Sequence, residues 1–110
     1  MMKKIYFTIT GMHFFEGDEF IEPGMEVMLE KEPDNKYDNE AILVKLPGVA
    51  AIGHVANSCN TVIGECYSAG RIYDKIGDNA YGKVLYKMGR GVVCELIMEE
   101  RVYATDNKKK

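Results

Sequence analysis

The chain has 110 residues, of which 46% are hydrophobic and 28% charged, a composition that suits one globular domain and excludes a disordered protein. Fourteen Lys and Arg residues against seventeen Asp and Glu residues give a net charge of −3. This balance argues against a non-specific grip on duplex DNA, whose affinity comes mainly from phosphate neutralisation, but it leaves open the recognition of a nucleic-acid end.

Six strands are predicted from runs of β-branched and aromatic residues that alternate with polar ones and end at Gly or Pro turns. They cover residues 4–10, 25–30, 41–46, 50–55, 81–88 and 92–98. The turn Pro47-Gly48 predicts a hairpin between the third and fourth strands. A second hairpin, between the last two strands, is predicted from the tip Gly89-Arg90-Gly91.

One helix is predicted between the fourth and fifth strands. Asn57 or Ser58 is a suitable N-cap, and Gly70 is placed as the residue that ends the helix. Apolar side chains recur between them at helical spacing: Val62, Ile63, Cys66 and Tyr67. Short strands with one helix predict a mainly β fold, a small OB-like antiparallel β-barrel of about six strands with one inserted α-helix. We expect this barrel to be partly open.

Hydropathy and cysteine usage bear on the cellular compartment. The sequence has no apolar stretch of 18 residues and no signal-peptide core, and its three cysteines lack metal-ligand spacing. In the predicted helix, Cys59 and Cys66 would stand about 10.5 Å apart along the axis, too far for a disulfide. We therefore expect a soluble cytoplasmic protein with reduced cysteines and with no membrane contact, metal or cofactor.

Catalytic motifs are missing from the sequence. It contains no Gly-x-Ser-x-Gly elbow, no phosphate-binding Gly-x-x-x-x-Gly-Lys loop and no recognisable pair of acids. A nucleophile made of Cys59 and His54 is conceivable, because Cys59 follows the predicted helix N-cap, but half-buried helix cysteines are far commoner. A zinc site fails because no C-x-x-C or H-x-x-H pair is present, and a calcium loop fails because the Gly at its sixth position and the flanking helices are absent. The sequence therefore predicts a binding protein rather than an enzyme.

The most informative stretch is the polar loop of residues 33–40, between the second and third predicted strands. It is longer than an ordinary hairpin loop, contains no Gly, and gathers polar residues around one aromatic: Asp34, Asn35, Tyr37, Asp38 and Asn39. Asn and Asp side chains bond their own backbone, which is typical of a purely structural loop. The alternative is a binding site, in which an aromatic ring stands beside hydrogen-bonding groups.

The candidate residues have two interpretations each. Tyr37 either anchors its own loop as a partly buried ring or stacks on a base. Asp38 either braces the loop backbone or accepts a hydrogen bond from a terminal hydroxyl. His54 lies on an apolar strand, where a core histidine with satisfied hydrogen bonds is the commoner outcome, and His13 is expected at a surface or rim.

Three pieces of the sequence resemble, in this order, the HIRAN domain, a module fused to certain chromatin-remodelling helicases and also found as small stand-alone bacterial proteins. The pieces are residues 11–17 (GMHFFEG), 29–44 (LEKEPDNKYDNEAILV) and 52–55 (IGHV). The middle piece is the most distinctive, and the resemblance extends to about residue 67. We expect one HIRAN-like domain over residues 1–105, followed by a frayed basic tail at residues 106–110.

The resemblance implies an OB-like barrel and, as for the helicase-fused members, capture of the 3′-hydroxyl end of single-stranded DNA, a function connected with DNA repair. By motif, the DNA-binding residues would be His13, Phe14, Asn35, Tyr37, Asp38 and His54, with Asn57 at a further contact position. The chain departs from the DNA-binding members of the family, which carry Arg and Tyr where it has His13 and Phe14, and Lys where it has Asn57. Two phosphate contacts are therefore expected to be lost.

In the nucleic-acid interpretation, Tyr37 and Phe14 stack on terminal bases. Asn35 and Asp38 then bond to the terminal sugar, and His54 lines the floor or contacts a phosphate. The alternative is a protein-interaction or scaffold module that uses the barrel edge without binding DNA. A positive groove beside Tyr37 would favour DNA, whereas a flat apolar patch there would favour a protein partner.

Overall fold

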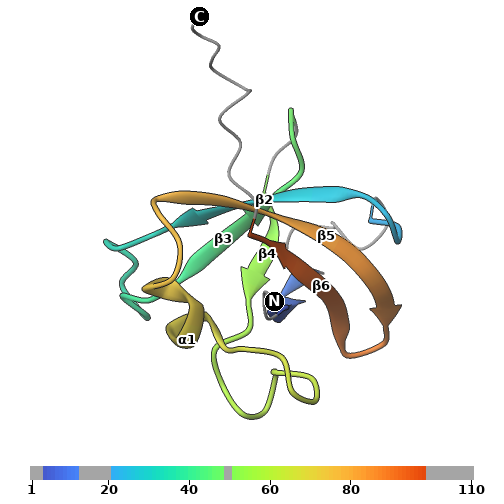
Figure 1. Cartoon of the computed structure of the whole chain (residues 1–110). Coiled ribbons are helices and arrows are strands. Elements are labelled where there is room, and N and C mark those ends of the chain that lie inside the picture. Colours follow the sequence, from blue (N-terminus) through green and yellow to red (C-terminus); the bar gives the residue numbers. More distant parts are fainter. Residues whose placement is uncertain (1–3, 13–20, 49–50, 99–110) are drawn as a thin grey trace, which may run out of the picture.

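The computed structural model describes residues 4–12, 21–48 and 51–98. Six strands and one short helix follow one another along the chain: β1 (Tyr6–Thr10), β2 (Glu26–Lys31), β3 (Ile42–Lys45), β4 (Ala51–Val55), α1 (Ala69–Tyr73), β5 (Asn79–Met88) and β6 (Gly91–Ile97). The strands form a closed barrel in the order β1-β4-β3-β2-β5-β6, and all neighbours are antiparallel (Figure 1).

The predicted mainly β barrel of six antiparallel strands with one helix is confirmed, but the barrel is closed rather than partly open. Closure is made by β1 and β6, which pair from Tyr6 opposite Glu95 to Ile9 opposite Val92. The two predicted hairpins are present as β3–β4 and β5–β6. Because every strand has a partner on both sides, the barrel leaves no long unpaired edge among the described strands.

The predicted helix between residues 57 and 70 is wrong, and the observed helix α1 begins only at Ala69. Residues 57–68 instead form turns that are tied to the barrel. The backbone N–H of Tyr67 donates to the Tyr6 carbonyl at 2.7 Å, and the N–H of Ile63 donates to the buried Thr8 hydroxyl at 3.1 Å. These bonds to β1 use the N–H groups that a helix would have needed. Ser68 provides the actual N-cap, accepting from Arg71 N–H.

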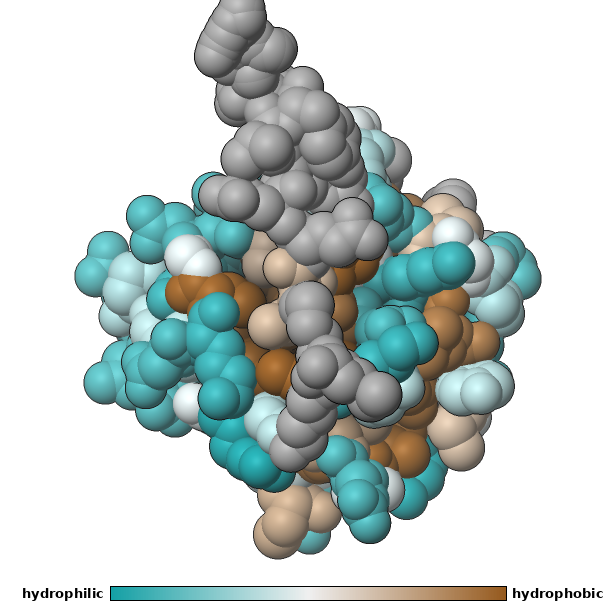
Figure 2. Space-filling view, viewed as in Figure 1, coloured by the Kyte–Doolittle hydropathy of each residue, from teal (hydrophilic) through white to brown (hydrophobic). Residues whose placement is uncertain are grey.

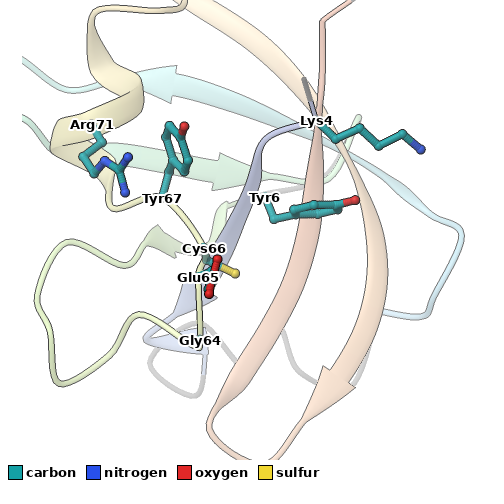
Figure 3. A pocket seen from close by; sticks show the side chains of 7 residues that line it. All are labelled: Lys4, Tyr6, Gly64, Glu65, Cys66, Tyr67 and Arg71. Atoms are coloured by element: carbon teal, nitrogen blue, oxygen red, sulfur yellow. The ribbon is translucent and has the colours of Figure 1, made fainter. Parts of the chain in front are cut away.

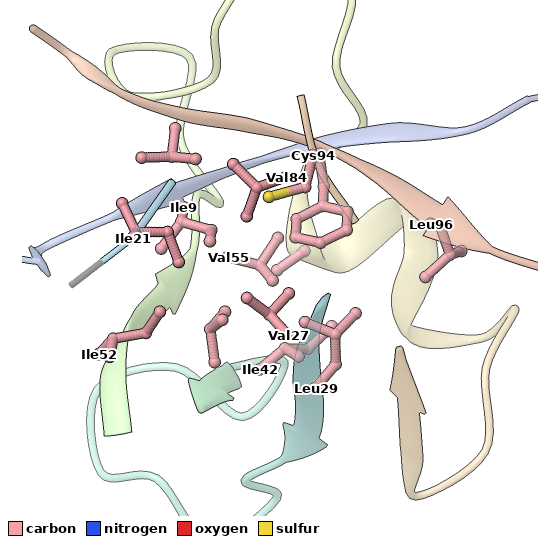
Figure 4. Packing of buried hydrophobic residues seen from close by; sticks show 14 of the residues in the cluster. Ile9, Ile21, Val27, Leu29, Ile42, Ile52, Val55, Val84, Cys94 and Leu96 are labelled. Atoms are coloured by element: carbon pink, nitrogen blue, oxygen red, sulfur yellow. The ribbon is translucent and has the colours of Figure 1, made fainter. Parts of the chain in front are cut away.

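The core fills the inside of the barrel. Figure 4 shows side chains from different strands meeting there. The largest fully buried side chains include Phe7, Ile9, Ile21, Leu29, Ile42, Ile52, Ile72 and Leu96, and Ala69 and Ile72 of α1 join the core. Burial alternates along β3 and β6, as expected for strands with one face toward a core. The apolar alternation that predicted the strands therefore also determines which side chains are inside.

One close approach in the core depends on a glycine. A Cβ atom added to Gly82 would stand 2.6 Å from the Cζ atom of Phe7, a ring that is fully buried. We expect Gly82→Ala to lower the free energy of unfolding by about 1–3 kcal/mol, because the ring cannot move without disturbing its neighbours. Urea denaturation measures the change. The control is Gly77→Ala, where a Cβ meets nothing within 4 Å; an equal loss in the control would contradict the steric explanation.

The three cysteines are free thiols in different environments. Cys59 is exposed in a turn, whereas Cys66 and Cys94 are buried. Burial, and secondarily the neighbouring Cys66, raise the pKa of Cys94 to about 12. The helix N-terminus that was expected to favour a Cys59 thiolate does not exist, since the helix begins ten residues later at Ala69. The nucleophile considered for Cys59 and His54 thus loses its structural support.

These environments predict an order of reaction with iodoacetamide, because the thiolate is the reactive form of cysteine. In the native protein at about pH 8, Cys59 should be alkylated first and Cys94 last, with Cys94 protected until the barrel opens. Peptide mass spectrometry over a time course gives the order. Denaturant should make all three react at similar rates. Rapid alkylation of Cys94 in the native protein would show that the β6 strand opens readily.

Candidate nucleic-acid interface

The loop between β2 and β3 is closed at its base and braced from within. The Glu32 N–H donates to the Ala41 carbonyl at 2.9 Å, which extends the hairpin by one step beyond β2. Asn35 Oδ1 accepts from the backbone N–H groups of Tyr37, at 2.9 Å, and Asp38, at 3.1 Å. The Asn35 side chain therefore replaces a backbone turn, as Asn does in many loops.

Asp38 connects this loop to the rest of the barrel. Its Oδ1 atom accepts from the Glu40 N–H at 2.9 Å, and its Oδ2 atom accepts from Asn57 Nδ2 at 2.8 Å. The Asn57 side chain continues the connection, because its Oδ1 atom accepts from the Gly70 N–H of α1 at 2.8 Å. A loop 19 residues away from Asn57 in sequence is thus held against the segment that follows β4. This geometry also gives Gly70 a place inside α1, not beyond its end.

A second connection runs through a residue that the sequence analysis missed. Glu32 Oε1 lies 2.8 Å from His54 Nε2 on β4 and also accepts from Asn35 Nδ2 at 3.2 Å. The side chains of His54 and Glu32 are about one-third exposed, at 33% and 30%, so the pair lies at the rim of the barrel and not in its core. Glu32 stands in the distinctive sequence block, but only the pairing of strands shows that it reaches His54.

The strand that carries His54 passes very close to β1. Thr10 of β1 pairs with His54, and a Cβ atom added to Gly53 would stand 2.7 Å from the Thr10 carbonyl oxygen. Only glycine permits this approach of two backbones, which explains the Gly-His order at this point of β4. The close approach fixes the position of His54 on β4 relative to the end of β1.

The Tyr37 ring projects from the braced loop into solvent. Its exposure of 94% is the largest among the exposed large hydrophobic residues of the described chain. The interpretation of Tyr37 as a partly buried anchor is therefore wrong. The Tyr37 backbone is nevertheless held by Asn35, so an exposed ring stands on a fixed support. This arrangement is suited to stacking against a flat partner.

The structure brings together most of the predicted site residues and leaves two undescribed. Asn35, Tyr37, Asp38, His54 and Asn57 belong to one hydrogen-bonded assembly, connected by the bonds given above. Two further predicted residues, His13 and Phe14, lie outside the described residues.

Charge around Tyr37 matches neither of the two expected surfaces. Residues 32–41 contain four carboxylates (Glu32, Asp34, Asp38 and Glu40) and one cation, Lys36, so the balance is 1 − 4 = −3. The loop thus carries a net negative charge, and its residues 33–40 contain one aromatic side chain, Tyr37, among polar neighbours. Figure 2 shows a hydrophilic surface on the left side of the molecule, where Figure 1 places the β2–β3 loop. Any nucleic acid bound here would depend on stacking and hydrogen bonds more than on phosphate contacts.

The described part of the chain contains neither a candidate metal site nor a membrane-spanning helix. No group of three or more His, Cys, Asp or Glu residues in residues 4–12, 21–48 and 51–98 could hold a metal ion. Within the same ranges, no helix is long and apolar enough to cross a membrane.

The fold and the loop define a small β-barrel with a binding surface at its rim. The HIRAN domain family matches residues 2–90, most of the chain, and the chain belongs to that family. The resemblance noted in the sequence is thereby confirmed. HIRAN domains are known as nucleic-acid-binding modules, and they are binding rather than catalytic domains.

Solved structures share the fold at low sequence identity. A protein from Lactobacillus plantarum has a TM-score of 0.58 and 19% identity, over 86% of this chain and 93% of that chain. The HIRAN domain of human HLTF has a TM-score of 0.57 and 18% identity, over 84% of this chain and 74% of that chain. At such identities the likeness shows the fold alone. No curated protein matches the chain.

Proposed function

We propose that this HIRAN domain binds single-stranded DNA at a free 3′ end, with Tyr37 as the stacking platform. The observation that carries the proposal is the 94% exposed ring on a loop whose backbone is fixed by Asn35. A rigid loop loses little conformational entropy when it binds, so the stacking energy is available for affinity. Stacking on an aromatic side chain contributes about 1–3 kcal/mol per base.

The hydrogen bonds of the loop refine the roles that we propose for the polar residues. Each Asp38 oxygen already accepts one bond, and a carboxylate oxygen has room for a second, so a 3′-hydroxyl can still donate to it. Asn35 Oδ1 accepts two bonds and is saturated, which leaves its Nδ2 group as the only part able to reach a sugar. Asn57 has both amide atoms engaged and positions Asp38.

Further residues complete the proposed site. Glu32 orients the His54 ring, and we assign His54 to the floor of the site. His13 and Phe14 enter through the family motif alone, Phe14 as a second stacking ring. We place this activity in the cytoplasm, on hydropathy and cysteine usage, and in DNA repair, as the family resemblance implies.

Fluorescence anisotropy tests the proposal directly. A labelled single strand with a free 3′-hydroxyl is titrated with the protein, and a blunt duplex of the same sequence is the comparison. We expect the single strand to bind and the blunt duplex to bind far more weakly, because paired bases cannot reach the Tyr37 ring. The absence of single-strand binding at high micromolar protein would overturn the proposal.

One observation favours a second candidate function. The net charge of −3 over residues 32–41 is unfavourable for binding a polyanion, whereas it would suit a basic segment of a protein partner. In that case the domain is a protein-interaction or scaffold module, and the braced loop presents Tyr37 to a protein. The same titration separates the two candidates, since a protein-interaction module does not bind the single strand.

A further inference from the structure

A hollow separate from the β2–β3 loop lies between the start of β1, the segment before α1, and α1 itself. Its volume is about 500 Å³, and it is lined by Lys4, Tyr6, Gly64, Glu65, Cys66, Tyr67 and Arg71 (Figure 3). Two cationic side chains and two aromatic rings therefore border one space. That combination is typical of sites for nucleotides, whose phosphates are anionic and whose bases are flat.

The Arg71 side chain is positioned by Tyr67. Its guanidinium carbon lies 3.8 Å from the centroid of the Tyr67 ring, a cation–π contact visible on the left of Figure 3. Tyr67 is itself fixed, because its N–H donates to the Tyr6 carbonyl at 2.7 Å and the residue bridges to Phe7. The guanidinium is thus held in place by its flat face, which leaves its N–H edges directed elsewhere.

Those N–H edges have no carboxylate partner among the described residues. The ion pairs of residues 4–12, 21–48 and 51–98 involve Lys4, Lys45 and His54, and Arg71 is in none of them. A guanidinium presents five N–H donors and matches phosphate geometry particularly well. Arg71 therefore has the position and the free donors that an anion site requires.

The other wall of the hollow is less strongly charged. Lys4 Nζ lies 3.7 Å from Glu95 Oε2, and Glu65 adds a carboxylate to the lining. Because Lys4 is engaged by Glu95, the anion contact falls mainly on Arg71. Tyr6, half-buried on β1, supplies a further aromatic surface.

We infer that this hollow is a second nucleotide-binding site, in which Arg71 contacts a phosphate and Tyr6 and the Tyr67–Arg71 stack contact a base. The inference rests on the proposed function in one respect, namely that the nucleotide belongs to the strand whose end the β2–β3 loop holds. Arg71 directly follows Gly70, whose N–H donates to Asn57 of the loop assembly, so α1 connects the two sites. A free mononucleotide has the same chemistry and is the alternative ligand of the hollow.

Arg71→Ala tests the inference, with Lys75→Ala as the matched control. Both residues are exposed and lose one positive charge, but Lys75 is not part of the hollow. Labelled single strands of about 4 and about 16 nucleotides span the site sizes of single OB folds. We expect Arg71→Ala to lower the affinity for the long strand roughly tenfold, as for loss of a charge-assisted hydrogen bond. The affinity for the short strand should change by less than about twofold, because the loop alone can bind it.

Further variants and ligands show whether the hollow binds a strand or a free nucleotide, and they separate the two proposals. Arg71→Lys should restore part of the affinity, since it keeps the charge but not the planar stack. Binding of thymidine monophosphate that Arg71→Ala abolishes would support the site with a free nucleotide as its ligand. Equal effects of Arg71→Ala and Lys75→Ala on the long strand would overturn the inference. If Tyr37→Ala leaves the short strand unaffected while Arg71→Ala weakens the long one, the loop proposal fails and the hollow remains.

Discussion

A single-stranded oligonucleotide with a 3′-hydroxyl is expected to bind roughly tenfold to a hundredfold more tightly than the same oligonucleotide with a 3′-phosphate. The reason is the Asp38 carboxylate, which can accept a bond from a hydroxyl in addition to those from Glu40 and Asn57. A hydrogen bond to a charged group contributes about 1.5–3 kcal/mol. A phosphate dianion offers no donor and is repelled by the carboxylates of the same loop. Anisotropy titrations of the two oligonucleotides measure the ratio.

The control for this prediction lies in the same loop. Asp38→Asn should shrink the difference between the two ends, because the neutral amide accepts a weaker bond and no longer repels the phosphate. Asp34→Asn removes an equal charge from an exposed residue of the loop and should leave most of the difference in place. If Asp34→Asn is as effective as Asp38→Asn, the loop charge and not Asp38 produces the preference. Equal affinity of the wild-type protein for both ends would favour the protein-interaction function.

Replacement of Tyr37 by Ala should weaken binding of both kinds of 3′ end by about 1–3 kcal/mol, or roughly fivefold to a hundredfold. The ring contributes stacking, which does not depend on the terminal group, so the ratio between the two ends should stay nearly constant. Because the side chain is 94% exposed, its removal should leave the midpoint of thermal unfolding almost unchanged. Tyr37→Phe should retain most of the affinity, since it keeps the ring.

Tyr86 on β5 offers a matched aromatic control, because it is also exposed, at 64%, and belongs to a different part of the barrel. Tyr86→Ala should leave DNA affinity unchanged. A loss of affinity equal to that of Tyr37→Ala would mean that exposed aromatic residues bind DNA without forming a defined site. An unchanged affinity in Tyr37→Ala would remove the main support of the proposed function.

The acidic balance of the loop explains why stacking carries so much of the proposal. Where DNA-binding relatives carry basic residues, this chain has His13 and Asn57, and Asn57 is occupied in holding Asp38 against α1. Arg71, whose guanidinium stacks on Tyr67 in the second hollow, follows Gly70 in the same helix. In the inference drawn above, the phosphate contact falls on Arg71 of α1 and not on the loop.

Local chemistry alone determined the strands, the hairpins and the existence of the polar loop. Alternating apolar residues specify which face of a strand is buried, and Pro47-Gly48 or Gly89-Arg90-Gly91 specify a turn, whatever the rest of the chain does. The family motif likewise stands within short stretches of sequence, so the HIRAN assignment needed no structure. Tyr37, Asp38 and His54 could be selected in the same way, because their residue types carry the chemistry.

Only the tertiary structure decided where the helix begins, that the barrel closes, and how the site is held together. The apolar spacing of residues 62–67 resembles a helix, but Tyr67 and Ile63 give their backbone N–H groups to β1, and such bonds between distant residues leave no local pattern in the sequence. The same holds for Glu32 beside His54 and for Asp38 beside Asn57, which are 22 and 19 residues apart. Hydrogen bonds of this kind are formed by strand pairing and packing, and for that reason they appear only when the whole barrel is assembled.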